Sequence, residues 1–379
     1  MKKILKIIGL FIAGIITVLA LWFCINQLDT KPSELSQELF FNQVQIPLEQ
    51  NGDVYLKGFG VPLGQKPYDA GLQIYEDHTD KKIDDILEFH GNAEGLYCWF
   101  LQDAPKEEKC QSLEELQETI SKNKTLLNRL EEMSKYDHFD EDMITYSFDD
   151  DTIQQTDYFR GQDFILLETL FNARLIALKK LGATEEAINL WIDNMNMLNN
   201  MLSSRQSMVF AAIVMITQNF TNDVITQLID GYDIDADTLS RIKNALIRPA
   251  FGENGMDLRK IYQAEYNNTF KQLNNYVKQE LDNRSAFYAK NNTLNLFAEY
   301  ANDVIKTSEN APDSFGKNNL HKKYSTDNAW NYLGLILYNP TGKLLLNGVL
   351  KSEELLKNRY QSTLKREKIW QKIEEESNN

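Results

Sequence analysis

An uninterrupted apolar run near the start of the chain restricts where the rest of it can fold. Residues 7–25, IIGLFIAGIITVLALWFCI, are uncharged and almost wholly apolar. A helix rises about 1.5 Å per residue, so this run covers close to the roughly 30 Å hydrocarbon core of a bilayer. The run therefore predicts one transmembrane helix, and nearly all of the remaining chain must then fold on one side of a membrane.

Charged residues beside the run predict its orientation. Lys2, Lys3 and Lys6 precede it, and the first lysine after it is Lys31. Because basic residues favour the cytoplasmic side, we expect residues 1–6 to form a cytoplasmic tail. The predicted location is the bacterial inner membrane, with a single pass and the bulk of the chain in the periplasm.

An apolar N-terminal run can also have two other fates. A cleaved secretory signal has the same basic start and apolar middle, but it ends in small residues, and the exit here is bulky from Leu21 to Asn26. A lipoprotein would be modified at Cys24, but Phe23 stands where a small residue is required. Both features favour an uncleaved signal anchor.

The composition predicts an ordered, acidic exported part. Hydrophobic residues make up 42% of the chain and aromatic residues 11%, enough to build a core. The net charge is −15, and without the three cytoplasmic lysines 37 basic and 55 acidic side chains leave −18. Such a charge disfavours nucleic acid and attracts cationic partners, although solubility alone also explains it.

Two cysteines on the predicted exported side are expected to form a disulfide. Cys98 and Cys110 would lie in an oxidising compartment if this is a periplasm. A zinc site needs four ligands, and only His90 is near in sequence. A redox pair normally has the closer C-x-x-C spacing.

The pattern along the chain is helical almost throughout. We predict an all-α fold, in which the transmembrane helix is followed by an exported domain of helical hairpins arranged as a bundle or an irregular solenoid. The expected divisions are a stalk or first packing helix over 26–48, a Gly/Pro-rich, disulfide-bearing subregion over 49–150, and a helical domain over 151–379. Glycines and prolines between 51 and 71 predict loops, with a short strand at 54–56.

Capping signals predict several helix ends. Ser112 and Glu115 form a capping box that opens a helix reaching about residue 136. Gly182 ends a helix, and Thr184 caps the next one, giving an antiparallel hairpin. The apolar stretch 208–216 is too short to span a bilayer and predicts a central buried helix that stops by Gly231. Further helices are expected over about 237–247, 258–281, 292–307 and 352–376.

The few clusters with possible chemistry all have simpler structural interpretations. Acidic residues over 137–151 are suited to calcium, but an acidic connection is usually just solvated. Asp233, Asp235 and Asp237 imitate the start of an EF-hand loop, but Thr238 replaces its glycine, so helix capping is favoured. His90 with Glu94 is only a weak metal pair. We therefore predict no metal, no cofactor and no named catalytic residue.

Several features follow one another in a characteristic order: Asn51, Tyr55 and Gly58, then Cys98 and Cys110, the helix Asn123 to Arg129, the run Asn339-Pro340-Thr341-Gly342, and Arg359-Tyr360. This order resembles an uncharacterised family of bacterial inner-membrane proteins with one N-terminal span and a helical periplasmic domain. The resemblance implies a location and a shared fold. It implies no activity and no catalytic residue.

These observations favour a membrane-anchored periplasmic binding or scaffold protein. Its partner would be a protein or an envelope component, including a cationic one, and not nucleic acid. A specific hypothesis is an immunity-type protein that neutralises a cationic periplasmic toxin. The alternative is a membrane-tethered envelope enzyme, such as a peptidoglycan hydrolase, which would need a deep pocket lined by buried carboxylates.

Overall fold

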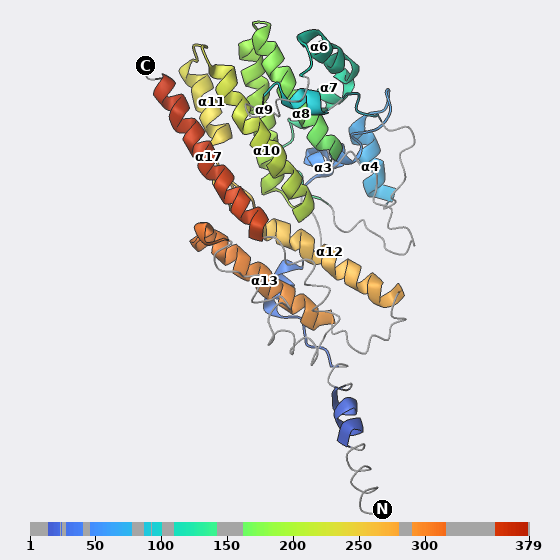
Figure 1. Cartoon of the computed structure of the whole chain (residues 1–379). Coiled ribbons are helices and arrows are strands. Elements are labelled where there is room, and N and C mark those ends of the chain that lie inside the picture. Colours follow the sequence, from blue (N-terminus) through green and yellow to red (C-terminus); the bar gives the residue numbers. More distant parts are fainter. Residues whose placement is uncertain are drawn as a thin grey trace, which may run out of the picture. The chain divides into compact units, whose positions relative to one another are not determined.

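The computed structural model describes residues 14–22, 24, 28–40, 46–77, 87–91, 93–100, 110–141, 162–279, 290–315 and 353–377. The chain forms two compact units. Unit 1 comprises Met1–Phe41 and Glu265–Lys357, and unit 2 comprises Asn42–Ala264 and Asn358–Asn379. The described residues are mostly helical and include isolated β-bridges but no strand, which confirms the all-α class (Figure 1). The predicted divisions at 26–48, 49–150 and 151–379 stay predictions.

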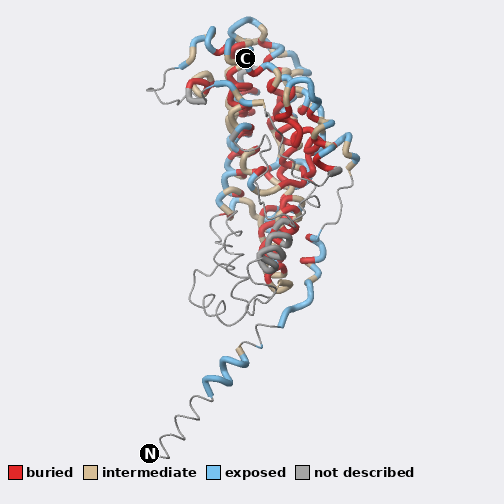
Figure 2. Tube along the Cα trace, turned by 90° about the vertical axis from the view of Figure 1, so that its right-hand side faces the viewer, coloured by how far each residue is buried: buried red, intermediate tan, exposed pale blue. Residues whose placement is uncertain are grey.

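Only part of the predicted transmembrane run falls within the described residues. Residues 14–22 are helical and mostly exposed (Figure 2), and the side chains of Ile16 and Val18 are each more than half exposed. The span over 7–25 and its orientation stay predictions. Among the described residues, α10 (Met208–Ile229) is long and apolar enough to cross a membrane. However, it packs against α8 (Gln162–Lys180) and α9 (Thr184–Ser203), as expected of a core helix.

In unit 1, the segment after the apolar run is tied to a helix far along the chain. Helix α2 (Glu34–Leu39) packs against α13 (Lys290–Asn310), and η2 (Pro312–Ser314) follows α13. Both carboxylate oxygens of Asp29 accept hydrogen bonds from α13, at 2.9 Å from the backbone N–H of Asn291 and 3.0 Å from that of Asn292. Asp29 thus caps a helix that lies 262 residues away in sequence.

Helices α8, α9 and α10 form the core of unit 2. Gly182 adopts a φ of +85° between α8 and α9, which confirms the predicted hairpin turn. The predicted cap at Thr184 is wrong, because Ala183 is the N-cap and makes no side-chain hydrogen bond. All three helices carry buried apolar side chains, among them Phe164, Leu167, Trp191, Leu198, Val214 and Ile225.

The remaining predicted helices follow this core along the chain. They correspond to α11 (Ala236–Leu246), α12 (Leu258–Gln279), α13 and α17 (Glu353–Ser377). Helix α11 belongs to unit 2 and α13 to unit 1, whereas α12 and α17 each have residues in both units. Asp235 accepts the backbone N–H of Thr238 and caps α11, which confirms the capping interpretation. Short elements precede the core: η1 (Leu48–Gln50) and α5 (Ala93–Tyr97).

The strand predicted at 54–56 is wrong, because these residues lie in a helix. Helix α3 (Gly52–Lys57) is followed by α4 (Pro67–Asp77), and the two pack closely. A Cβ atom at Gly58 would overlap the carbonyl of Pro67, and one at Gly71 would overlap that of Val54. These glycines therefore serve the close approach of two helices rather than an extended loop.

The helix predicted from the capping box at Ser112 is interrupted. The capping box itself is confirmed at the start of α6 (Leu113–Lys122), but α7 (Lys124–Met133) begins after a break at Asn123. The side chain of Asn123 accepts the backbone N–H of His90 and donates to its carbonyl. A side chain that pairs with another segment's backbone competes with helix continuity at this point.

Candidate functional site

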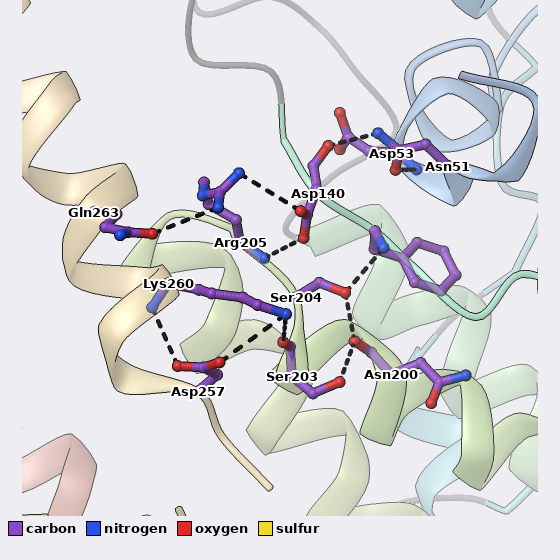
Figure 3. A network of polar contacts seen from close by, with 11 residues as sticks. Asn51, Asp53, Asp140, Asn200, Ser203, Ser204, Arg205, Asp257, Lys260 and Gln263 are labelled. Carbon is purple, nitrogen blue, oxygen red and sulfur yellow. Dashed lines mark hydrogen bonds and ion pairs between the residues drawn. The ribbon is translucent and has the colours of Figure 1, made fainter. Parts of the chain in front are cut away.

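A buried ion pair lies where four segments of unit 2 meet (Figure 3). Nη1 of Arg205 is 3.6 Å from Oδ2 of Asp140, and both side chains are less than a tenth exposed. Oδ1 of Asp140 accepts the backbone N–H of Arg205 at 2.7 Å. The other side of Arg205 donates to Gln263 on α12 at 3.4 Å. Burial lowers the pKa of Arg205, while Asp140 and Asp257 oppose that shift.

Hydrogen bonds to its backbone hold the segment that carries Asp140. Asn51 donates its amide to the carbonyl of Asp140 at 2.7 Å, and the N–H of Gly52 donates to His138 at 2.7 Å. On the opposite side, the hydroxyl of Ser204 accepts the N–H of Phe139 and donates to Asn200. The segment 138–141 is thus fixed between α3 and the loop that follows α9.

A second polar group extends this network toward α12 (Figure 3). Nζ of Lys260 donates to the carbonyl of Ser203 at 3.0 Å and lies 4.0 Å from Oδ2 of Asp257. Asp257 also accepts the backbone N–H of Lys260 at 3.2 Å. The charged groups of the network therefore pair with one another, so their main role is to join segments of unit 2.

This network corrects the expectation for the acidic connection. Asp140 and Glu141 are buried and hydrogen-bonded, so a solvated loop is the wrong description of residues 139–141. Residues 142–150 lie outside the described part of the chain. Within the described part, no group of three or more His, Cys, Asp or Glu residues is arranged to hold a metal ion.

A buried polar seam crosses the three core helices. Asn194 on α9 donates to Oε2 of Glu168 on α8 at 2.8 Å, and Asn172 on α8 donates to Thr221 on α10 at 3.1 Å. Trp191 donates its indole N–H to the carbonyl of Thr221 at 2.8 Å. All five side chains are nearly or fully buried. The hairpin therefore packs through specific hydrogen bonds as well as apolar contacts.

Glu168 is the carboxyl group of this seam, and its pKa is strongly shifted. Its side chain is 1% exposed, and burial raises its pKa from 4.5 to about 8, although the hydrogen bond from Asn194 opposes the shift. Its Oε1 atom, like Oδ1 of Asn194, has no hydrogen-bond partner in the described structure. Burial therefore favours the protonated form of Glu168 at neutral pH, in which one carboxyl oxygen carries a hydrogen and is a donor.

A cavity of about 650 Å³ adjoins this part of the seam. It lies between α7, α8 and α9, and Asn194 forms part of its wall. Its lining includes an apolar portion and an excess of acidic groups over basic ones. The lining residues are Asn128, Leu130, Glu131, Glu132, Ser134, Lys135, Phe171, Leu190, Asp193 and Asn194.

The three carboxylates of the cavity differ in how they are held. Glu131 forms an ion pair with Arg174 at 2.5 Å, and Glu132 accepts the hydroxyl of Tyr55 at 2.6 Å. Burial and Glu132 raise the pKa of Tyr55, so the tyrosine keeps its proton and donates it to this bond. Desolvation raises the pKa of Asp193, while Arg241 opposes the shift. Desolvation therefore disfavours the charge of Asp193, and a bound cation would favour it.

The predicted site residues lie apart from this cavity. Cys98 and Cys110 form the predicted disulfide, with their Cα atoms 5.5 Å apart. His90 uses its backbone to bind Asn123, and no metal cluster includes it within the described residues. Sequence reasoning missed Glu168 and Asn194. The only signal in the sequence is that each of them is a polar residue on a face of its helix that is otherwise apolar.

No family model, curated protein or solved structure matches this chain. The resemblance to an uncharacterised inner-membrane family therefore stays a prediction. The fold and the site define the protein by class alone: a protein whose described residues are mostly helical, with a buried polar seam and an adjoining acidic cavity.

Proposed function

We propose that this protein is a membrane-anchored periplasmic binding protein whose helical unit 2 receives a cationic group of its partner. The observation that carries the proposal is the cavity between α7, α8 and α9, lined by Glu131, Glu132 and Asp193 against one lysine, Lys135. The net charge of −15 favours encounter with the same kind of partner.

The anchor is supported by the N-terminal sequence and by the exposure of its described residues. Ile16, Val18 and Leu21 are each more than half exposed, which is unfavourable in water and favourable in lipid. An anchored binding module would meet partners in the envelope. An immunity-type role against a cationic toxin is one form of this function.

The contacts that the carboxylates of the cavity already make favour binding over hydrolysis. Glu131 is paired with Arg174, and Glu132 accepts a hydrogen bond from Tyr55. Glu168, the group with a general acid's pKa, is not among the lining residues. A glycosidase needs two carboxyl groups that both reach the substrate, and two of the three carboxylates of this cavity already contact Arg174 and Tyr55. A membrane-tethered envelope hydrolase stays the alternative prediction.

The binding proposal is tested with penta-lysine as the cationic probe. The full chain in nonionic detergent micelles is titrated calorimetrically at about 50 and 300 mM salt. We expect saturable binding that weakens several-fold at the higher salt, because the Debye length shortens. Asp193→Asn should weaken binding further, whereas Glu186→Gln, at an exposed position of the same helix, should change it little. No binding, or equal loss in both variants, overturns the proposal.

The anchor is tested separately by fractionation of cells that express the full chain. We expect the protein to stay in the membrane after alkaline washing, and its bulk to be accessible to protease only once the periplasm is opened. Release by washing would contradict a transmembrane anchor. Digestion from the cytoplasmic side would contradict the orientation.

A further inference from the structure

We infer that the C-terminal part of α17, residues 358–377, is a detachable arm of unit 2, which leaves α10 as a whole helix while the core of α8, α9 and α10 stays folded. This conformational device is independent of the cavity, because no residue of α17 is part of the cavity wall. The inference depends on which side chains the arm buries and on which of them lack partners there.

The buried face of the arm is polar along most of its length. Its apolar members are Trp370 and Ile373, near the end of the helix. In contrast, α9 buries mainly apolar side chains. Because apolar burial is the main contribution that holds a helix on a core, the arm is held less firmly than α9. The polar members of the face are Arg359, Ser362, Thr363 and Arg366.

Polar contacts with α10 and α11 hold the arm in place. Near the end of the arm, Nζ of Lys243 on α11 lies 5.1 Å from the centre of the Trp370 ring. An ion pair that stays partly exposed adds little to such an attachment. The contacts with α10 pair Arg359 with Gln218, Ser362 with Asn219, and the partly exposed Lys365 with Asp223 at 2.6 Å.

Arg366 brings a charge into this face without a partner on another helix. Its side chain is fully buried, and its Nη2 atom donates to Thr363 on the same helix at 3.1 Å. Its Nε and Nη1 atoms have no partner in the described structure, and neither do the two amide atoms of the buried Asn222 on α10. Burial lowers the pKa of Arg366 to about 10, Glu367 opposes this shift, and Arg248 adds to it. The closed arm thus leaves donors unsatisfied that water would satisfy in the open state.

Opening of the arm exposes mainly polar groups. Arg359 and Arg366 regain water as a partner, and so does the amide of Gln218 on α10. The apolar side chains that lose cover on the arm are Trp370 and Ile373. A small apolar area limits both the loss of hydrophobic stabilisation and the tendency of the open state to self-associate. The arm is therefore the part of unit 2 that opens and closes reversibly while the core keeps its structure.

The test is amide hydrogen exchange of the full chain in nonionic detergent micelles, followed by mass spectrometry at several urea concentrations. We expect the amides of residues 362–373 to exchange at least about 100-fold faster than those in the middle of α9, because the arm opens without the core. These amides should share one opening equilibrium that depends on urea. Fraying of a helix end would instead give protection that falls gradually toward Ser377.

Two substitutions on the buried face should shift the opening in opposite directions. Arg366→Met removes the unpartnered charge, so exchange in the arm should slow about fivefold. Arg359→Met removes the donor to Gln218 and to the carbonyl of Ala250, so exchange in the arm should quicken about thirtyfold or more. Exchange in α9 should not change in either variant. Lys368→Met, at an exposed position of the arm, is the matched control and should change neither helix.

Three results would overturn the inference. Equal exchange in the arm and in α9 would mean that α17 opens only together with the core. A gradual fall of protection toward Ser377 would mean that the helix frays and does not detach as a whole. Arg366→Met exchange that is unchanged or faster in the arm, or that changes equally in α9, would mean that the unpartnered charge does not drive opening. Circular dichroism establishes that each variant is folded, and if Arg359→Met is not, wild type against Arg366→Met still decides.

Discussion

Asn194 and Glu168 join α9 to α8 through a hydrogen bond of 2.8 Å that is sealed from water. Both side chains of the pair are polar, and burial keeps the Glu168 proton in place at neutral pH. A neutral carboxyl group in a core is compatible with folding, because only its charged form carries a large desolvation cost. The stability of unit 2 should therefore depend on pH through this residue.

Glu168→Gln should remove that dependence. The pKa of Glu168 is about 8 in the folded state against 4.5 ordinarily, so the folded protein holds a proton that the unfolded chain has lost. The free energy of unfolding should then fall as the pH rises from about 5 to 8, by up to about 1.4 kcal/mol per pH unit. Urea denaturation at several pH values measures the difference between wild type and variant. A difference that is constant with pH would contradict the assignment.

Arg366→Met and Arg359→Met should have different effects on the free energy of unfolding. Both arginines are buried in α17, but Arg359 donates to Gln218 and, at 3.1 Å, to the carbonyl of Ala250. Nε and Nη1 of Arg366 have no partner in the described structure. Burial lowers the pKa of both arginines, that of Arg366 to about 10, so the contrast lies in their partners: the hydrogen bond that Arg366 makes is local, from Nη2 to Thr363 on the same helix.

Replacement of Arg366 by methionine should thus leave stability unchanged or raise it by about 1 kcal/mol. Replacement of Arg359 should cost about 2 to 4 kcal/mol, because two buried oxygens lose their donor. Urea unfolding of the two variants side by side tests the contrast. Equal losses would mean that the partners of Arg359 contribute little.

Helix existence was far easier to predict than the polar interior. Ser112 with Glu115, Gly182 and Asp235 act through local backbone chemistry, and each lies where the sequence placed it. Glu168 and Asn194 depend on which helices meet, a tertiary fact that no local pattern contains. A polar residue in a helix is usually exposed, so the sequence favoured the wrong environment for both.

Gly58 and Gly71 illustrate the same limit for the backbone. Glycines and prolines around them predicted loops, because glycine is usually a turn residue. The structure uses both glycines where α3 and α4 approach each other closely. Such a contact depends on the packing partner and cannot be inferred from composition.

Gly58→Ala should therefore destabilise unit 2 strongly. The new methyl group would overlap the carbonyl of Pro67, which is backbone and cannot rotate away. We expect a loss of about 2 to 3 kcal/mol, typical of overpacking. Gly64→Ala is the control: no atom lies near its Cβ position, and its φ of +90° should cost only about 1 kcal/mol. Similar losses in both variants would argue against the close contact.

The disulfide should stabilise unit 2 chiefly through the unfolded chain. Cys98 and Cys110 are 12 residues apart, and closing a loop of that length is worth about 3 kcal/mol on the chain-entropy model. The double variant Cys98→Ser with Cys110→Ser should lose roughly that amount in urea unfolding. Cys24→Ser, at the free cysteine, should show no loss. A reducing agent should lower the wild type to the level of the double variant and leave that variant unchanged.

Asp29→Ala should loosen the start of α13 without unfolding unit 2. Its carboxylate accepts two backbone N–H groups of α13 and complements the positive end of that helix. Loss of such a cap costs about 1 kcal/mol, so amides of the first turn of α13 should exchange their hydrogens about fivefold faster. Asp313→Ala, in the short helix after α13, is the matched control. Asp29 follows the predicted span by only four residues, so the same bond would hold α13 close to the membrane surface. Unchanged exchange at Asn291 and Asn292 in Asp29→Ala would show that this connection does not order the helix.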